Sequence, residues 1–308
     1  MEIALQFVLL ALGFVMLAKG ADWFVEGAAG IAMRFGIPQL VIGLTIVAMG
    51  TSAPEAAVSI AAAVKGNADI TIGNIVGSNI LNILVILGLA ASIVPIAVAR
   101  STVRIEIPFM IGVTALLFYQ GRDGSISLAD GGVLMVAFAV YMMYLYTMAM
   151  KSNVDSDLEE PGLPLGRCLL GAVGGLALII AGSNVTVGAA TSIATYAGLS
   201  ERFIGLTIVA LGTSLPELFT SVAAARRGNA DIAIGNIVGS NIFNILFVVG
   251  LSSLIIDIPF ASAFNFDTYV ALGAAVLLML CVLRTQRLQR WAGALMLVCY
   301  AVYLGYIL

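Results

Sequence analysis

The sequence predicts an all-α membrane protein, with ten transmembrane helices arranged as two inverted five-helix repeats. Composition, the number of apolar segments and an internal repeat lead to this fold class. Of the 308 residues, 61% are hydrophobic and 10% are charged, whereas soluble domains carry roughly 25% charged residues. The alternation of apolar and polar residues that marks membrane β-strands is absent from the sequence, so the spans are expected to be helical.

Ten apolar segments, each near the roughly 20 residues that cross a bilayer as a helix, recur between turns and charged residues. The first segment is longer than the others, and we expect it to be bent or tilted. It has no positively charged start and no small-residue cleavage site, so a retained helix is favoured over a signal peptide. The expected spans are residues 3–33, 38–64, 69–95, 105–120, 127–150, 164–190, 203–225, 231–256, 268–284 and 290–308.

The longest predicted loop, Lys151–Pro164, divides the chain into two parts. It contains the sequence DSDLEEPG, which is typical of a solvated acidic linker. We therefore expect a first five-helix half at residues 1–150, a cytoplasmic linker at residues 151–163 and a second five-helix half at residues 164–308.

An internal repeat lies within these halves. Residues 42–90 and 204–252 align at a constant offset of 162 without a gap, and 35 of the 49 aligned residues are identical. With less similar flanks, the repeats cover about residues 38–95 and 200–256. Because each half holds five helices, an odd number, the second copy should enter the membrane upside down. Many secondary transporters have this inverted-repeat architecture.

The basic residues agree with the inversion and predict the orientation. The loop AAAVKGNAD of the first repeat carries one Lys, and the matching loop AAARRGNAD carries two Arg. With both termini outside, ten basic residues face the cytoplasm and three face outward, as the positive-inside rule requires. The cytoplasmic set is Arg34, Arg100, Arg104, Lys151, Arg167, Arg226, Arg227, Arg284, Arg287 and Arg290, and the outer set is Lys65, Arg122 and Arg202.

Each repeat carries one acid within its first span. Glu55 lies in GTSAPEAAVS, and Glu217 lies in GTSLPELFTS. A charge near the bilayer centre costs at least about 2.5–3.5 kcal/mol, which favours a functional role for the pair. Glu55 lies four residues beyond the middle of its span, about 6 Å toward the outside. Inversion would place Glu217 toward the inside, so that the two acids bracket the midplane.

Proline and hydroxyl residues surround both acids. Pro54 has no N–H and its ring clashes with the carbonyl four residues back, so we expect a kink near Gly50 with released carbonyl oxygens. Pro216 should act in the same way near Gly212. The hydroxyls either bond back to their own helix or line a site, and their duplication beside a broken turn favours a site. They are Thr51, Ser52, Ser59, Thr213, Ser214 and Ser221.

A second motif, GNIVGSNI, also occurs twice, at residues 73–80 and 235–242. With the asparagine that follows each copy, it places neutral oxygens at i, i+4 and i+8, on one helix face. Polar contact between helices is the alternative role for these side chains, and the paired glycines of each copy favour close helix packing. The polar side chains are Asn74, Ser78, Asn82, Asn236, Ser240 and Asn244.

Together the motifs predict an all-oxygen cation site. They supply two carboxylates with hydroxyls, amide oxygens and kink carbonyls, and the sequence contains no His. Ca²⁺ binds 6 to 8 oxygens in a flexible shell, whereas softer metals prefer nitrogen and sulfur. A hard cation is therefore the expected ligand.

The two motif pairs resemble the α-repeats of the cation/Ca²⁺ exchanger superfamily, whose signature is a GTSxPE helix followed by a GNxxGSNxxN helix. GTSAPE with GNIVGSNILN and GTSLPE with GNIVGSNIFN match it once in each half. The resemblance covers the whole chain and is closest to a minimal prokaryotic sodium/calcium exchanger. It implies a cell (inner) membrane protein that exchanges Na⁺ for Ca²⁺ by alternating access.

The resemblance also implies roles for individual residues. Ca²⁺ would be coordinated by Glu55, Glu217, Thr51, Thr213 and the backbone carbonyls of Ala48 and Ala210. Na⁺ sites around the same acids would be formed with Ser52, Ser214, Ser78, Ser240, Asn82 and Asn244. Some relatives, typically those that cotransport K⁺, carry Asp where this chain has Asn244, so the neutral amide argues against a K⁺ requirement.

The residues leave other functions open. A Ca²⁺/H⁺ antiporter would use the Glu residues as proton carriers, and a passive cation channel would need acidic rings around an axis. Paired, off-axis acids argue against the channel, and the lack of His argues against a hydrolytic enzyme. We expect the transported ions and the lipid bilayer as partners, with no cofactor, nucleic acid or obligatory protein partner.

One charged cluster has no place in this scheme. Lys19, Asp22 and Glu26 lie in the long first span, at spacings of i+3 and i+7. We expect an ion pair within this helix near a membrane interface, although a part in gating is an alternative.

Overall fold

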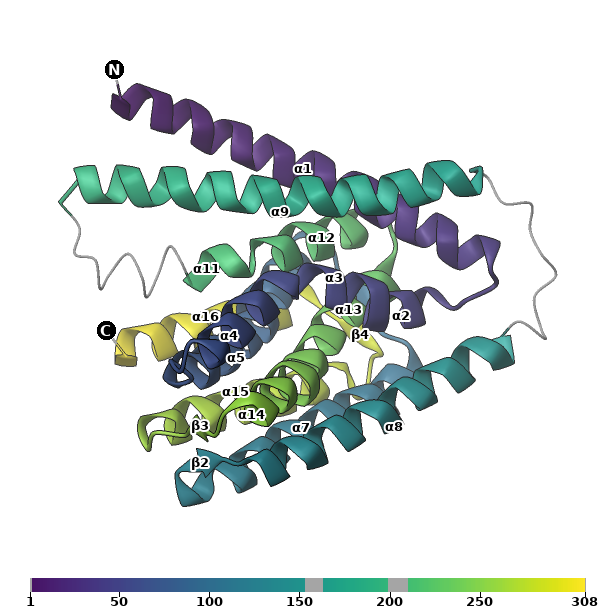
Figure 1. The fold of residues 1–308 in the computed structure, drawn as a ribbon. Coiled ribbons are helices and arrows are strands. Elements are labelled where there is room, and N and C mark those ends of the chain that lie inside the picture. The colour runs from purple at the N-terminus through teal and green to yellow at the C-terminus, as the bar shows by residue number, and fades with distance from the viewer. Residues whose placement is uncertain (1, 153–162, 199–209, 308) are drawn as a thin grey trace.

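The computed structural model describes residues 2–152, 163–198 and 210–307, and it is almost entirely helical (Figure 1). The first half contains α1 (Glu2–Arg34), α2 (Gln39–Ile42), the π-helix η1 (Gly43–Val47), α3 (Ala48–Thr51), α4 (Ala53–Val64), α5 (Asp69–Leu81), the π-helix η2 (Asn82–Leu87), α6 (Gly88–Ile93), β1 (Ile96–Ala97), the π-helix η3 (Thr102–Glu106), α7 (Ile107–Gln120), the 3₁₀ turn η4 (Gly121–Asp123), β2 (Ser125–Ile126) and α8 (Leu128–Ser152). The second half contains α9 (Leu165–Tyr196), α11 (Ala210–Thr213), α12 (Leu215–Arg226), α13 (Ala230–Phe243), the π-helix η6 (Asn244–Val249), α14 (Gly250–Ile255), β3 (Ile258–Pro259), α15 (Ala263–Val282), β4 (Arg287–Leu288) and α16 (Arg290–Ile307).

The helical membrane character is confirmed. Within the described residues, eight helices are long and apolar enough to cross a bilayer, and the bent pair Gln39–Thr51 with Ala53–Val64 adds a ninth. The remaining expected span, residues 203–225, begins outside the described residues and continues as α11 and α12.

One span begins earlier than expected. The helix α15 starts at Ala263, five residues before the predicted start at residue 268. The prediction placed Asp267 outside the span because of its charge. In the structure the Tyr303 hydroxyl donates a hydrogen bond of 2.9 Å to the Asp267 carboxylate, so this acid has a partner inside the helical segment.

The long helices α1 and α9 lie side by side as one layer over the remaining helices (Figure 1). With 33 residues, α1 is about 50 Å long at 1.5 Å per residue, more than the roughly 30 Å hydrocarbon core. It therefore either tilts in the bilayer or extends beyond its hydrocarbon core. Small residues allow the close contact, because a Cβ atom at Gly20 would lie 2.9 Å from the Gly175 carbonyl oxygen, and one at Gly27 would lie 2.4 Å from the Ala172 nitrogen.

The centre of the molecule is formed by α13, in which every residue from Ile232 to Phe243 is buried. Its glycines make the close contact that the GxxxG pattern predicts. A Cβ atom at Gly235 would lie 3.1 Å from Gly43 Cα, and one at Gly239 would lie 2.8 Å from Leu44 Cα. In the first repeat, the glycines of α5 would make the equivalent contact with the residue that matches Gly43 at the offset of 162. That residue lies outside the described residues.

Two small antiparallel ribbons join the halves. Residue Ile96 of β1 pairs with Leu288 of β4, and Ile126 of β2 pairs with Ile258 of β3. The offset of 162 relates Ile96 to Ile258 and Ile126 to Leu288. The two ribbons are therefore equivalent under the sequence repeat, and each combines one strand from each half.

The proline motifs break their helices as predicted, but two residues later than expected. The helix axis bends by 51° between Thr51 and Ala53, at Ser52 (φ −82°, ψ 7°). The prediction placed the kink near Gly50, because the Pro54 ring would clash with the Gly50 carbonyl. In the structure, Pro54 instead lies in the first turn of a new helix, where its missing N–H needs no partner. Ser214 has nearly the same backbone conformation (φ −90°, ψ 4°).

The carbonyl that Pro216 leaves without an amide partner is used. The Ser183 hydroxyl of α9 donates a 2.7 Å hydrogen bond to the Gly212 carbonyl, four residues before the proline. The residue matching Ser183 in the first half is Ala21, which has no hydroxyl. The two breaks are therefore supported differently by their neighbouring long helices.

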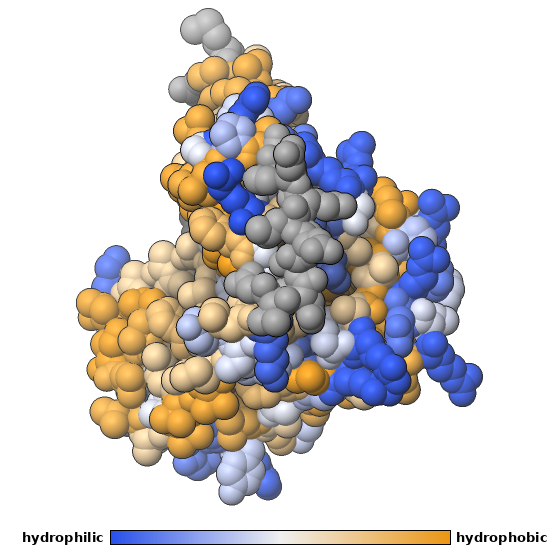
Figure 2. Space-filling view, turned by 90° about the vertical axis from the view of Figure 1, so that its right-hand side faces the viewer, coloured by the Kyte–Doolittle hydropathy of each residue, from blue (hydrophilic) through white to orange (hydrophobic). Residues whose placement is uncertain are grey.

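The two ends of the described chain lie on one side of the molecule, where α1 begins and α16 ends, and the junction of α8 with α9 lies on the opposite side (Figure 1). Figure 2 faces the α8–α9 junction and shows hydrophilic residues gathered there, with hydrophobic residues along the flank. This pattern is typical of the water-facing end of a membrane-spanning bundle.

The orientation is open to a direct test. A reporter active only in the cytoplasm should be silent when fused after Leu308 and active when inserted between Ser152 and Leu163, because basic residues concentrate near that junction. Immunoblots should show equal amounts of both fusions. Activity in the C-terminal fusion with silence in the inserted one would reverse the orientation.

Candidate cation-binding site

The two acids of the repeated motifs meet in the interior. Glu55 lies in the first turn of α4 and Glu217 in the first turn of α12, and each is only 1% exposed. Each acid lies beside the helix break of the other repeat, because Glu217 accepts a hydrogen bond from Ser52 and Glu55 accepts one from Ser214. Within residues 2–152, 163–198 and 210–307 neither acid forms an ion pair with Lys or Arg. Two buried carboxylates without a cationic side chain require another source of positive charge.

Each carboxylate is held by a hydroxyl from the other repeat. The Ser52 hydroxyl donates a 2.7 Å hydrogen bond to Glu217 Oε1, and the Ser214 hydroxyl donates a 3.2 Å bond to Glu55 Oε1. These serines are the residues at which the two helices break. Each break therefore places its serine hydroxyl beside the acid of the other repeat, and the structure brings these predicted residues together.

Each carboxylate has one oxygen without a hydrogen-bond partner among the described residues. The Oε2 atoms of Glu55 and Glu217 are buried and have no hydrogen-bond partner in the described part of the chain. The same holds for the amide oxygens of Asn82 and Asn244. Four buried oxygens thus lack a donor, and none of them can donate a hydrogen bond itself while the acids are ionised. Such a set fits a hard cation.

The remaining predicted residues lie around these oxygens. Ser78 and Ser240 are buried one turn before the two asparagines, and the Ser240 hydroxyl lies 3.4 Å from the Ala48 carbonyl of the other half. Thr213 lies at the end of α11, whose first described residue is Ala210. Among the described residues, no group of three or more His, Cys, Asp or Glu occurs, so neutral oxygens have to complete a cation shell.

Irregular helix geometry coincides with the site. π-helical turns begin at Asn82 and at Asn244, and another, η1, ends directly before Ala48. A π-helical turn shifts the hydrogen-bond ladder by one residue and often occurs at functional sites.

Two predicted polar residues instead hold helices together. The Asn236 amide nitrogen donates to the Ser221 hydroxyl at 2.9 Å and lies 3.4 Å from the Glu217 carbonyl, while its oxygen accepts from Thr51 at 2.9 Å. Asn74 makes the first two contacts in the other repeat. These amides fasten the GNxxGSN helices to the backbone of the acid-bearing helices, which was the alternative role considered for them.

Two residues that hydrogen bond to predicted site residues escaped the sequence analysis. Asn79 and Asn241, which follow the serines of the GSN motifs, are buried and hydrogen bond to the asparagines at positions 82 and 244. Both copies of the motif contain this asparagine, and that repetition could have indicated a role for it. The sequence analysis considered only the i, i+4, i+8 face, on which these two residues do not lie.

The two halves differ beside the site. A cavity of about 680 Å³ runs along α4 between Pro54 and α9, and its lining includes Ala57 and Thr213. The residue matching Ala57 is Phe219, whose ring lies 6.1 Å from that of Phe14 in α1. The helix α1 therefore packs on α12, whereas α4 faces an open space.

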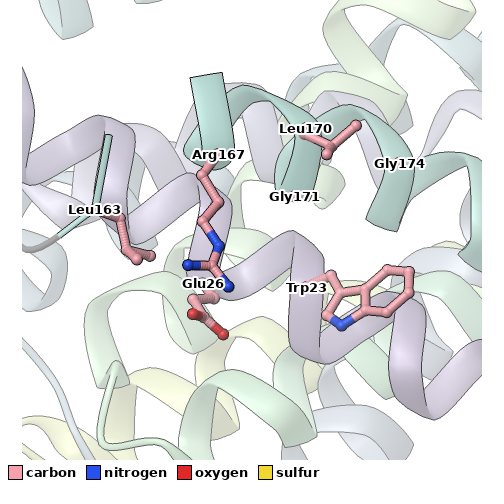
Figure 3. Close-up of a pocket in the computed structure, with 8 residues that line it drawn as sticks. Trp23, Glu26, Leu163, Arg167, Leu170, Gly171 and Gly174 are labelled. Carbon is pink, nitrogen blue, oxygen red and sulfur yellow. The ribbon is translucent and has the colours of Figure 1, made fainter. Parts of the chain in front are cut away.

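The charges of α1 do not form the expected pair within the helix. Lys19 is exposed, and Asp22 and Glu26 instead contact Arg227 of the second half, each at 3.2 Å. Figure 3 shows Glu26 below Arg167 of α9, beside a pocket that Trp23 also lines. The helical spacing predicted the partner wrongly because Arg227 approaches from a distant part of the sequence.

The fold and the buried polar groups define an integral membrane protein with carboxylate, hydroxyl and amide oxygens gathered in its interior, contributed by two sequence repeats. The family model described as "Sodium/calcium exchanger protein" matches residues 5–147 and 168–308. The chain belongs to this sodium/calcium exchanger family, and thus to a family of cation antiporters rather than enzymes.

Individual relatives cover almost the whole chain. The "Putative antiporter CaxA" of Alkalimonas amylolytica is 40% identical, with 98% of each chain covered. The "Sodium/calcium exchanger MaX1" of Methanosarcina acetivorans is 32% identical, also over 98% of each chain. A solved structure of the sodium-calcium exchanger NCX_Mj, soaked with zero Na⁺ and Ca²⁺, superposes with a TM-score of 0.87 at 33% identity, covering 99% of this chain and 100% of that one.

The two acids can be tested by binding. Glu55→Gln and Glu217→Gln keep the side-chain volume but remove a charged ligand, so each should weaken Ca²⁺ binding by roughly tenfold or more, since contacts to charged groups are worth about 1.5–3 kcal/mol. Calorimetric titration of purified protein in detergent measures this change.

A matched control is available for the same titration. Glu106 is also fully buried. Like the two acids, it accepts one hydroxyl hydrogen bond, from Tyr144, and leaves Oε2 unpartnered among the described residues, but it lies at the end of η3, outside the repeated motifs. Glu106→Gln should bind Ca²⁺ like the parent protein. Equal weakening in all three variants would mean that any buried carboxylate has the effect, and would remove Glu55 and Glu217 from the site.

Proposed function

We propose that this protein is a secondary-active antiporter that exchanges Na⁺ for Ca²⁺ by alternating access, with the ions bound at the midplane between two inverted repeats. The observation that carries the proposal is that Glu55, Glu217, Asn82 and Asn244 each have a buried oxygen with no donor among the described residues, on helices that contact one another across the repeats. Relatives named as sodium/calcium exchangers support the same assignment.

The ion set follows from the oxygens. Ca²⁺ would bind the two Glu carboxylates with Thr51, Thr213 and the carbonyls of Ala48 and Ala210, because a divalent cation needs both charges nearby. Na⁺ ions would bind around the same acids with neutral hydroxyls and amides: Ser52, Ser78, Asn82, Ser214, Ser240 and Asn244. A proton needs only a titratable Glu, so the duplicated neutral oxygens favour Na⁺ over H⁺.

Buried charge explains why transport would be coupled. An empty site leaves two carboxylates close together and poorly hydrated, and carrying them through a closed state has a high free-energy cost. One Ca²⁺ or several Na⁺ remove most of that cost. Only the loaded protein then changes access, which produces exchange rather than leak.

Several features support ten helices in two inverted halves, with residues 151–163 as the linker. The described helices follow the ten expected spans, and the two β-ribbons are related by the sequence repeat. The β1–β4 ribbon includes Arg287 and lies just before Arg100, and both arginines belong to the predicted inner set. The β2–β3 ribbon lies just after Arg122, which belongs to the predicted outer set. The protein would lie in the inner membrane of a prokaryote with both termini outside.

Alternating access is supported by the difference between the halves. The cavity along α4 gives the site a route on the side that the basic residues predict to be outside. On the other side Phe14 and Phe219 close the matching space. If α12 came to face an open space as α4 does now, and α4 became packed as α12 is now, the cytoplasmic route would open and the outer route would close.

Among the described residues, ion pairs occur only on the closed side. Arg227 joins α12 to Asp22 and Glu26 of α1. The matching residues in the other half are Lys65, Asn184 and Gly188, which cannot form the same pairs. The inner closure would therefore have an electrostatic component that the outer closure lacks, and opening toward the cytoplasm would require both pairs to break.

The driving ion is tested by ⁴⁵Ca²⁺ uptake into proteoliposomes under separately imposed gradients. An outward Na⁺ gradient should drive uptake without K⁺, because Asn244 is neutral and the sites are rich in oxygen. A pH gradient should not replace Na⁺. Uptake that follows the pH gradient and ignores Na⁺ would establish the Ca²⁺/H⁺ alternative, and uptake without any counter-ion would establish a channel.

The ion pairs are tested by thiol labelling in a cysteine-free background that carries Thr220→Cys, because Thr220 is buried on α12 and its matching residue, Val58, lines the cavity along α4. Arg227→Gln should raise the labelling rate from the cytoplasmic side about 2- to 5-fold, since half-exposed ion pairs contribute only about 0.2–1 kcal/mol each. Arg226→Gln is the matched control, because neighbouring Arg226 forms no ion pair with any described residue. Equal effects of both substitutions would show a general influence of positive charge and exclude a specific closure by Arg227.

A further inference from the structure

Four asparagine side chains form a closed network where α5 and α13 cross. The Asn79 amide nitrogen donates to the Asn241 backbone carbonyl at 3.2 Å, and the Asn241 amide nitrogen donates to the Asn79 carbonyl at 3.1 Å. Asn82 donates to Asn241 Oδ1 at 2.9 Å, and Asn244 donates to Asn79 Oδ1 at 3.1 Å. All four side chains are at most 3% exposed.

The two backbone carbonyls determine the orientation of all four amides. A carbonyl oxygen can only accept a hydrogen bond, so the groups that face the Asn241 and Asn79 carbonyls have to be the NH₂ groups of Asn79 and Asn241. Their amide oxygens then point the other way, toward Asn244 and Asn82. Those two residues in turn have to present NH₂ groups to these oxygens.

The consequence appears at the cation site. With their NH₂ groups engaged, Asn82 and Asn244 direct their Oδ1 atoms away from the network, and these are the atoms without a partner among the described residues. A reversed amide would place an NH₂ group, which repels a cation, where a ligand oxygen is needed. It would also place two amide oxygens against each other inside the network.

We propose that Asn79 and Asn241 are positioning residues, which lock the amides of Asn244 and Asn82 with their oxygens toward the bound Na⁺. The inference rests on the proposed function, because it assumes that Asn82 and Asn244 bind Na⁺. The backbone carbonyls fix the orientation of the Asn79 and Asn241 amides. Through their oxygens, these two amides in turn fix the orientation of the Asn244 and Asn82 amides in the other repeat.

Two substitutions at one position separate positioning from a merely structural role. Asn241→Leu keeps the shape but removes the acceptor for Asn82, so the Na⁺ concentration that half-activates exchange should rise about 5- to 10-fold. Asn241→Asp keeps an acceptor for Asn82, loses the donor to the Asn79 carbonyl and, when ionised, adds a negative charge, which does not weaken cation binding. It should therefore not raise the half-activating Na⁺ concentration by more than about twofold. The half-saturating Ca²⁺ concentration and the maximal rate at saturating Na⁺ should change little in both variants.

A double-mutant cycle identifies the residue through which Asn241 acts. In an Asn82→Ala background the amide that Asn241 positions is absent, so Asn241→Leu should have no further effect on Na⁺ activation. In an Asn244→Ala background its effect should persist in full, because Asn79 still finds the Asn241 backbone carbonyl. Asn79→Leu with Asn244→Ala provides the same test in the other repeat, should Asn241→Leu not fold.

The outcomes distinguish the two proposals. If Asn82→Ala shifts Na⁺ activation and Asn241→Leu does not, the positioning role is overturned while the ion site stands. Equal shifts for Asn241→Leu and Asn241→Asp, or an undiminished effect of Asn241→Leu in the Asn82→Ala background, also overturn it. If Asn82→Ala leaves Na⁺ activation unchanged, the assignment of Asn82 as a ligand fails first, and the positioning role fails with it.

Discussion

The structure depends on one constraint: the carboxylates of Glu55 and Glu217 have to lie in the interior of a membrane protein, each beside the helix break of the other repeat and without a Lys or Arg partner among the described residues. The free energy of burying such a pair is prohibitive unless hydrogen bonds and a cation compensate it. Helix breaks at Ser52 and Ser214, hydroxyls crossing from one repeat to the other, and unpartnered oxygens at Glu55 and Glu217 are responses to this constraint. The rest of the fold supplies a scaffold of small and aliphatic residues that keeps these groups in place.

The polar side chains divide into two sets with different tasks. In one set, which includes Asn74 and Asn236, the amide nitrogens donate hydrogen bonds to backbone carbonyls and hydroxyls of neighbouring helices. The other set, including Asn82 and Asn244, leaves an oxygen free. The two sets lie on the same helices at spacings of two turns. Identical side chains thus differ in role because of what the opposing helix offers them.

Much of this arrangement was predictable from the sequence because the membrane makes polar residues rare and therefore informative. Apolar length located the helices, and the duplicated motifs located Glu55 and Glu217. Sequence patterns could not predict contacts that depend on how the repeats face each other. Asn79 and Asn241 lie off the expected helix face, and Arg227 reaches Asp22 from more than two hundred positions away. The start of α15 was missed because the partner of Asp267 lies on another helix.

The crossed hydrogen bonds have a consequence for the origin of the molecule. The acid of each repeat is held by the serine of the other, and the amide network and both ribbons also need one contribution from each. A single five-helix unit would have an acid without its hydroxyl and strands without their mates. Before duplication joined the two copies, an ancestral half would therefore have had to work as a homodimer, and the linker made permanent an association that binding equilibrium had previously maintained.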